Sequence, residues 1–136
     1  MIVNLQQLGR AVKRLQHKHH RLVDTRLGEL GSSLAQWDGL RAISRNPDAS
    51  SHALAEYTFQ TDQAFGTLAK RLIAKGLVKR SSGGGRVLHH KLTPQGEVVL
   101  QLGNEAVESI LVVSFASLSQ AERLTLLDLI SRLVPN

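Results

Sequence analysis

TDQAFGTLAKRLIAKGLVKRSSGGGRVLHHK, residues 61–91, is the stretch that decides the fold of this chain. In its first half the apolar side chains recur at helical spacing, at Phe65, Leu68, Leu72 and Ile73. Gly76 is a typical end for that helix. The second half holds two strand-like segments, LVKRSS and RVLHHKL, on either side of a glycine run, which is typical of a hairpin. The stretch therefore predicts a short helix that leads directly into a two-stranded β-ribbon.

The charge of this stretch is one-sided, because every charged side chain in it after Asp62 is basic. A helix with cations on one face, followed by a basic hairpin, can place one element in a DNA groove and the other along the phosphates. Glycines at the hairpin tip tolerate positive φ and would let the neighbouring Arg86 enter a minor groove. A nucleotide-binding loop is disfavoured, since the Gly-x-x-x-x-Gly-Lys-Ser/Thr spacing and the helix after it are missing.

Length and composition fit one compact domain. A chain of 136 residues with 42% hydrophobic content can bury one core but not two complete ones. The sequence contains no cysteine, which excludes a disulfide framework, a thiol nucleophile and a cysteine redox switch. It has no run of about 18 apolar residues and no continuous apolar signal core at its start, so we expect a cytoplasmic protein.

The positive charge is concentrated in one part of the chain. Residues 1–93 hold 15 Lys and Arg against six acids, a net charge of +9, whereas residues 94–136 hold two against five, a net charge of −3. A local excess of cations favours a polyanionic partner, because binding there releases condensed counterions. The alternative is a basic surface that only keeps the protein soluble.

Residues 2–30 are expected to form a helix whose apolar stripe needs a partner helix. The cluster of His17, His19 and His20 could in geometry share a metal ion, but no acid or cysteine stands at ligand spacing, so we expect solvated or interface histidines and no metal. His19 is the one expected to be buried, because it lies on the stripe. The stripe comprises Leu5, Leu8, Val12, Leu15, His19 and Leu22.

Two short helices joined by about three residues predict a helix-turn-helix. Ser32 or Ser33 can cap a helix over residues 34–46, Ser51 can cap the first helix of the motif, and Thr61 can cap the second. In the second helix Gln63 and Thr67 suit base edges, whereas Lys70 and Arg71 suit phosphates or guanine.

Two residues of the second helix leave alternatives open. Asp62 can support the helix N-terminus or accept a hydrogen bond from a cytosine amino group, and the first role is favoured. Gly66 costs stability inside a helix, so a close approach is expected there, by the neighbouring helix or by DNA.

The motifs of residues 34–97 resemble the winged helix-turn-helix of MarR-family transcriptional regulators. LAQWDGLRAI, ALAEYT, LAKRLIAKGLVKR and LTPQGE resemble, in order, the family's helix before the motif, its first motif helix, its recognition helix with the first wing strand, and its junction from wing to helix. The family's Asp-x-Arg wing motif is incomplete, because Gly84 stands at the acid's position and Arg86 at that of the arginine. The resemblance covers nearly the whole chain.

The C-terminal third is expected to form dimerisation helices. Thr93 can cap a long helix that begins at Pro94 and carries a stripe of Val99, Leu102, Ala106, Ile110 and Val113, and Ser119 with Glu122 makes a capping box for the last helix. That last helix is apolar around too much of its circumference for a monomer, which predicts a symmetric homodimer on a near-palindromic operator. The expected dimer residues are Leu5, Leu8, Val12, Leu15, Ile110, Leu126, Leu127, Ile130 and Leu133.

We therefore expect a mostly α fold with a small β-hairpin wing: a winged helix-turn-helix between N- and C-terminal dimerisation helices. The expected organisation is an N-terminal dimerisation helix (1–30), a DNA-binding region (31–93) and C-terminal dimerisation helices (94–136) within one compact domain. The expected DNA-binding residues are Ser51, Thr61, Gln63, Thr67, Lys70, Arg71, Lys79, Arg80 and Arg86.

The resemblance further implies a regulator of transcription, such as a repressor, that responds to a small lipophilic or phenolic effector. The effector would bind in a crevice between the dimer helices and the DNA-binding region, which His19, Arg21, Trp37 and Arg41 could line. For Trp37 the alternative, a packing residue of the core, is favoured over a ligand role. No cofactor is expected. An enzyme is disfavoured, because no nucleophile or acid/base pair stands at recognisable spacing. The alternative function is a winged-helix module that binds proteins without sequence-specific DNA binding.

Overall fold

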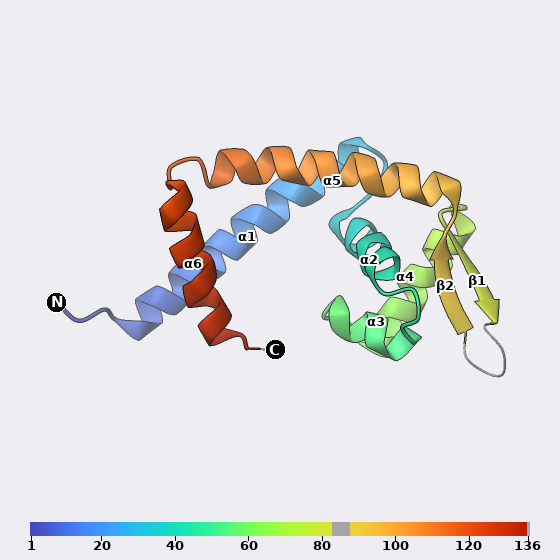
Figure 1. The fold of residues 1–136 in the computed structure, drawn as a ribbon, viewed down its shortest axis with the longest axis horizontal. Helices are drawn as coiled ribbons and strands as arrows, with labels where there is room; N and C mark the ends of the chain where they lie inside the picture. The colour runs from blue at the N-terminus through green and yellow to red at the C-terminus, as the bar shows by residue number, and fades with distance from the viewer. Residues whose placement is uncertain (83–87, 136) are drawn as a thin grey trace.

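The computed structural model describes residues 1–82 and 88–135, and these residues form a mostly helical fold with one hairpin (Figure 1). This confirms the fold class expected from the sequence. The elements follow the order α1 (Leu5–Glu29), α2 (Leu34–Arg45), α3 (Ser51–Tyr57), α4 (Asp62–Ala74), β1 (Val78–Ser82), β2 (Leu88–Leu92), α5 (Pro94–Ser114) and α6 (Gln120–Leu133).

The main core lies where α2, α3, α4 and the hairpin meet. Phe65 and Leu72 of α4 are fully buried there together with Leu40 of α2 and Leu54 of α3. Burial of such a side chain stabilises the fold by roughly 1.5–3 kcal/mol. The predicted apolar face of α4 is correct at three positions, but Ile73 is only half-buried, and the smaller Ala69 is buried in addition.

The helix starts follow from side-chain caps. The Asn4 side-chain oxygen accepts hydrogen bonds from the backbone N–H groups of Gln6 and Gln7, so α1 begins at Leu5 and not at residue 2 as predicted. Ser50, not the predicted Ser51, caps α3, because the Ser50 hydroxyl accepts from Ala53 N–H. The capping roles of Ser33 and Thr61 are confirmed.

The hairpin is antiparallel, and Val78 of β1 stands opposite Leu92 of β2. It is joined to α5 through Thr93, whose hydroxyl donates to the Gly76 carbonyl oxygen at 2.6 Å and accepts from Gly96 N–H at 3.0 Å. A side chain at position 96 would overlap the Leu77 carbonyl oxygen, so the helix can start this close to the strand only with glycine there. The LT-x-x-G pattern is thus explained by one compact junction.

The long helix α5 connects the winged part to the end of the molecule where α6 lies (Figure 1). It packs against α1 in a second, smaller core of Val23, Leu27 and Val107. Of the predicted α5 stripe, Ala106 is buried, Val99 and Ile110 are half-buried, and Leu102 and Val113 are exposed in the single chain. The other buried positions of α5 are Gly96, Leu100, Gly103 and Val107. In the described part of the chain no helix is long and apolar enough to span a membrane.

Candidate nucleic-acid interface

Four polar side chains lie on the side of α4 that faces away from the core, and we call this surface the α4 outer face: Gln63, Thr67, Lys70 and Arg71. All four are exposed, since the opposite side of the helix is held by Phe65, Leu68 and Leu72. The Thr67 hydroxyl donates to the Gln63 carbonyl oxygen at 3.1 Å, so its methyl group and its oxygen lone pairs remain for contacts outside the helix.

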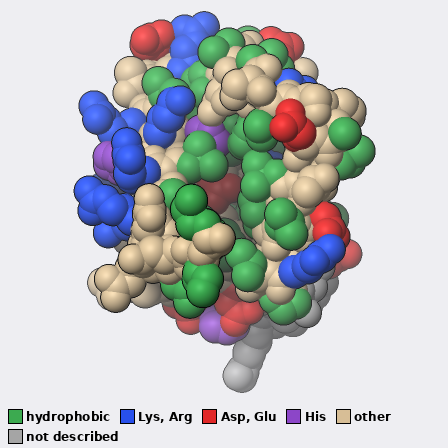
Figure 2. All heavy atoms as spheres, turned by 90° about the vertical axis from the view of Figure 1, so that its left-hand side faces the viewer, with side chains coloured by type: hydrophobic (Ala, Val, Ile, Leu, Met, Phe, Trp, Pro, Cys, Tyr) green, Lys and Arg blue, Asp and Glu red, His purple; other side chains and the backbone are tan. Residues whose placement is uncertain are grey.

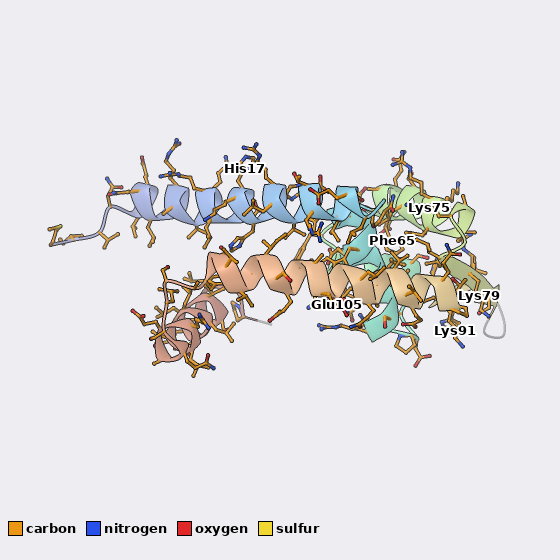
Figure 3. The ribbon with its side chains drawn as sticks, turned by 90° about the horizontal axis from the view of Figure 1, so that it is seen from above. His17, Phe65, Lys75, Lys79, Lys91 and Glu105 are labelled. Carbon is orange, nitrogen blue, oxygen red and sulfur yellow. The ribbon has the colours of Figure 1, made fainter. Side chains whose placement is uncertain are left out.

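The hairpin, which packs against α4, carries further cations. Lys79 and Arg80 of β1 are exposed, and Lys79 stands opposite Lys91 of β2 in the register. Figure 3 labels both lysines at the hairpin end of the molecule. Like charges in opposed positions destabilise a ribbon unless an anion neutralises them. In the described ranges none of these side chains, nor Lys70 or Arg71, forms an ion pair.

Lys75 has a structural role instead. Its ammonium group donates to the Gly31 carbonyl oxygen at 2.9 Å and to the Gln36 side-chain oxygen at 2.7 Å. It therefore links the end of α4 to the start of α2, and it does not belong to the free cations of the interface.

A histidine that the sequence analysis did not single out joins the two helices of the motif. His52 contacts Asp62 through Nδ1 at 2.8 Å and Glu56 through Nε2 at 2.9 Å. The hydrogen bond to Asp62, with the charges of both carboxylates, raises the pKa of His52. The Asp62 carboxylate thus lies in the first turn of α4, as expected, and contacts His52, while Thr61 caps the helix. No sequence signal marks a ten-residue pairing of this kind.

Ser51 and Thr61 are exposed near the starts of α3 and α4. Both helix starts lie on the same part of the motif, because His52 of α3 contacts Asp62 of α4. Backbone N–H groups at such starts can bind phosphate oxygens. The predicted Arg86, with Gly84, lies outside the described residues.

The second strand of the hairpin is anchored by a histidine. His90 is 3% exposed and meets the ring of Phe65 edge-on, with ring centroids 6.0 Å apart. Neither ring nitrogen has a hydrogen-bond partner among the described residues. Burial, then Arg80 and His89, lower the pKa of His90. His90 is buried and His89 is half-buried. The two histidines therefore contribute to the packing of the hairpin on α4 more than to the solvent-exposed surface.

The four predicted crevice residues do not share one set of contacts. The Arg41 guanidinium lies 5.5 Å from the centre of the Trp37 ring, and the Trp37 indole N–H donates to Asn104 at 2.9 Å. His19, expected to be buried, is half-buried, and it instead contacts the Ser114 hydroxyl at 2.5 Å and the ring of Phe115.

Arg21 lines a separate open groove of about 690 Å³ along α1, which also contains Arg14, Lys18, Leu22 and Ile110. The groove and the Trp37–Arg41 pair are therefore two distinct places in the structure. In the described part of the chain, no three His, Asp or Glu side chains are grouped as a metal site.

Most of the predicted dimer residues lie on exposed apolar surfaces of α1 and α6, and Ile110 lies on α5. Leu5 is 78% exposed, and Leu127 and Leu133 of α6 are 62% and 76% exposed. Figure 2 faces the end of the molecule that holds α6 and the start of α1, and it shows hydrophobic side chains across the centre with Lys and Arg along one edge. Of the other predicted dimer residues, Leu8, Val12, Leu15 and Ile130 are exposed and Ile110 and Leu126 are half-buried.

Comparison with known proteins gives a consistent result. A family model described as MarR family matches residues 30–86. The HTH-type transcriptional repressor Rv2887 of Mycobacterium tuberculosis strain H37Rv is 33% identical over 89 residues, which span 64% of this chain and 64% of that protein. The chain thus matches less than two thirds of the length of this curated relative.

Solved structures extend the likeness over nearly the whole chain. The crystal structure of a probable transcriptional regulator from Pseudomonas aeruginosa is 27% identical, with a TM-score of 0.82, and the match covers 96% of this chain and 100% of that one. The Mycobacterium tuberculosis MarR family protein Rv2887 in complex with DNA is 25% identical, with a TM-score of 0.77, covering 93% and 97%. Its complex with p-aminosalicylic acid is 26% identical, with the same TM-score and the same coverages.

Proposed function

We propose that this chain is a MarR-family transcriptional regulator that binds double-stranded DNA with sequence specificity, since a MarR-family model matches its residues 30–86. The observation that carries the proposal is the α4 outer face beside a basic hairpin, with four cations that are free of ion pairs in the described ranges: Lys70, Arg71, Lys79 and Arg80. Binding of DNA there neutralises cations that the fold leaves unpaired. The relative Rv2887, whose structure with DNA is known, supports this assignment.

In this proposal α4 enters the major groove. Gln63 and Thr67 contact base edges, because a glutamine amide can pair with adenine and a threonine methyl can pack against thymine. Lys70 and Arg71 contact phosphates or guanine, Lys79 and Arg80 follow the backbone, and Ser51 and Thr61 approach phosphates from the helix starts. Arg86, outside the described residues, belongs to the same proposal as a minor-groove contact.

We further propose that the protein acts as a homodimer on a near-palindromic operator. The helix α6 has 14 residues and no buried one, and a helix of this length is marginal in water without packing. Its exposed Leu127, Ile130 and Leu133, with Leu5 and Leu8 of α1, supply the apolar surface that a second copy would cover. In this division of the chain, residues 31–93 bind DNA and residues 1–30 and 94–136 dimerise.

A small lipophilic or phenolic effector is proposed to regulate DNA binding. The relative Rv2887 has been solved in complex with salicylic acid and with p-aminosalicylic acid. In this chain the Arg41 guanidinium lies over the Trp37 ring, and Trp37 contacts α5 through Asn104; an aromatic ring beside a cation suits an aromatic anion. In a dimer, the effector would change the distance between the two DNA-binding regions. It can do so only if it binds the conformations with the two distances with different affinity.

The test is DNA binding across a range of salt concentrations, measured by fluorescence anisotropy with a duplex that the parent protein selects from a randomised library. We expect a steep loss of affinity with salt, and Lys70→Ala should lower the slope of log K against log salt by about 0.9. Gln63→Ala should instead change the selected sequence. Lys18→Ala, which removes a cation of α1, is the matched control and should leave the slope unchanged.

Two results would contradict the proposal. Absence of DNA binding by the parent protein would favour the alternative, a winged-helix module that binds other proteins. Equal effects of Lys70→Ala and Lys18→Ala would show that net charge, and not the α4 outer face, determines binding.

A further inference from the structure

Gly66 is a glycine that packing among the described residues does not require. It lies inside α4, where glycine costs about 1 kcal/mol relative to alanine. A Cβ atom built at Gly66 meets no other atom within 4 Å among the described residues, whereas one at Gly39, Gly96 or Gly103 meets a neighbouring element at once. Of the two alternatives that the sequence leaves open, close approach of the neighbouring helix is therefore excluded for the described residues.

The position of Gly66 relates it to the α4 outer face. It follows Gln63 by three residues and precedes Lys70 by four, so it lies beside both on the helix surface. Its neighbour Thr67 keeps its hydroxyl hydrogen within the helix. Gly66 is half-buried, so the missing side chain leaves a partly exposed strip of helix backbone between the proposed base-contacting Gln63 and the cation of Lys70.

We propose that a strand of duplex DNA packs directly against the backbone at Gly66, and that the missing side chain determines how deeply α4 enters the major groove. Glycine is the residue that permits such a close approach of backbone to ligand. Lys70, one turn further along α4, is exposed and unpaired in the described ranges and supplies the charge that draws a phosphate to this strip. This inference rests on the proposed DNA-binding function and adds a position that determines the docking depth.

The experiment compares Gly66→Ala with Gly28→Ala. Both replace a helical glycine that has open space around it, but Gly28 lies on α1. Both variants should melt at the same or a higher temperature than the parent, because alanine favours the helix. On the duplex selected by the parent protein, Gly66→Ala should weaken binding about tenfold, which corresponds to about 1.4 kcal/mol, and Gly66→Leu should weaken it further. Gly28→Ala should bind as the parent does.

The outcomes separate this inference from the proposed function. If the parent protein fails to bind DNA, the proposed function fails with it. If the parent binds and Gly66→Ala binds equally well, only the inference about Gly66 is wrong. A Gly66→Ala variant that melts below the parent would also overturn it, because the side chain would then clash within the protein itself.

Discussion

Phe59 adopts a backbone conformation that glycine would adopt at lower cost. It lies in the turn between α3 and α4 with φ of 57°, and its side chain is 95% exposed. The left-handed region costs a residue with a Cβ roughly 1–2 kcal/mol, and the exposed ring recovers little of it by packing. Helix-turn-helix turns often hold glycine for this reason.

Phe59→Gly should therefore stabilise the protein. We expect the free energy of unfolding to rise by about 0.5–1 kcal/mol, because relief of the backbone strain exceeds the entropy that glycine adds to the unfolded chain. Urea denaturation measures it. Phe59→Ala is the control, since it removes the ring but keeps the strain and should leave the stability within about 0.5 kcal/mol. A loss of stability in Phe59→Gly would show that the ring packs.

The buried His90 predicts a second change at the residue scale. Its ring nitrogens have no hydrogen-bond partner among the described residues, and an unsatisfied buried polar group costs roughly 1–3 kcal/mol. His90→Leu should therefore raise the free energy of unfolding by about 1 kcal/mol at neutral pH, since leucine fills a similar volume against Phe65. A decrease would show that the imidazole is solvated or bonded in solution.

The same residue sets a pH dependence. The folded protein has a lowered pKa at His90, so below the unfolded pKa of about 6.5 the unfolded chain binds more protons than the folded one. Stability should fall as the pH drops below that value, and His90→Leu should remove this part of the slope. The measurement is urea denaturation of the parent and of His90→Leu across this pH range, and an unchanged slope in the variant would contradict the assignment to His90. His52 has a raised pKa, so its protonated form stabilises the folded protein at low pH. This stabilisation is lost as the pH rises above about 6.5, the opposite of the effect of His90.

At the scale of elements, the junction between the hairpin and α5 determines the orientation of the wing. Thr93 closes it with a hydrogen bond to the Gly76 carbonyl oxygen, and Gly96 allows the first turn of α5 to contact the Leu77 backbone. A Cβ atom at position 96 would meet backbone atoms of Leu77 and not a side chain. No rotamer change could therefore relieve the overlap. The wing and the start of α5 must therefore move together.

Gly96→Ala should destabilise the protein strongly, by about 3 kcal/mol, since overpacking against backbone cannot relax through a rotamer change. Thermal melting measures it. Gly66→Ala carries the same chemical change on α4 and should have the opposite sign, which makes it the control for helix propensity. Equal melting temperatures for the two variants would show that the junction is looser than the structure indicates.

The sequence predicted the elements better than their contacts. The caps at Ser33 and Thr61 and the LT-x-x-G junction were predictable, because capping and turn chemistry are local. The buried side of α5 was not predictable from the apolar stripe. Trp37 packs against Gly103, so the side of α5 that carries this glycine faces the core. The pairing of His52 with Asp62 depends on the angle between two helices, which no local pattern encodes.

For the whole molecule, the open question is what covers the apolar surfaces of α1 and α6. The free chain exposes Leu127 and Ile130 on a helix with no buried residue, and the proposed answer is a second copy of the chain. If so, folding and association are linked, and the melting temperature must depend on protein concentration.

Leu127→Glu with Ile130→Glu should convert the dimer to a monomer, because two carboxylates would have to be buried without partners. Sedimentation velocity measures the mass, and the melting temperature of the variant should lose its concentration dependence. Glu108→Lys, an exposed charge change on α5, is the control. A monomeric variant should also bind the selected duplex far more weakly, since each half-site would then be bound alone. If the double variant remained a dimer with unchanged DNA affinity, α6 would not be the dimer interface, and the exposed leucines would need another partner.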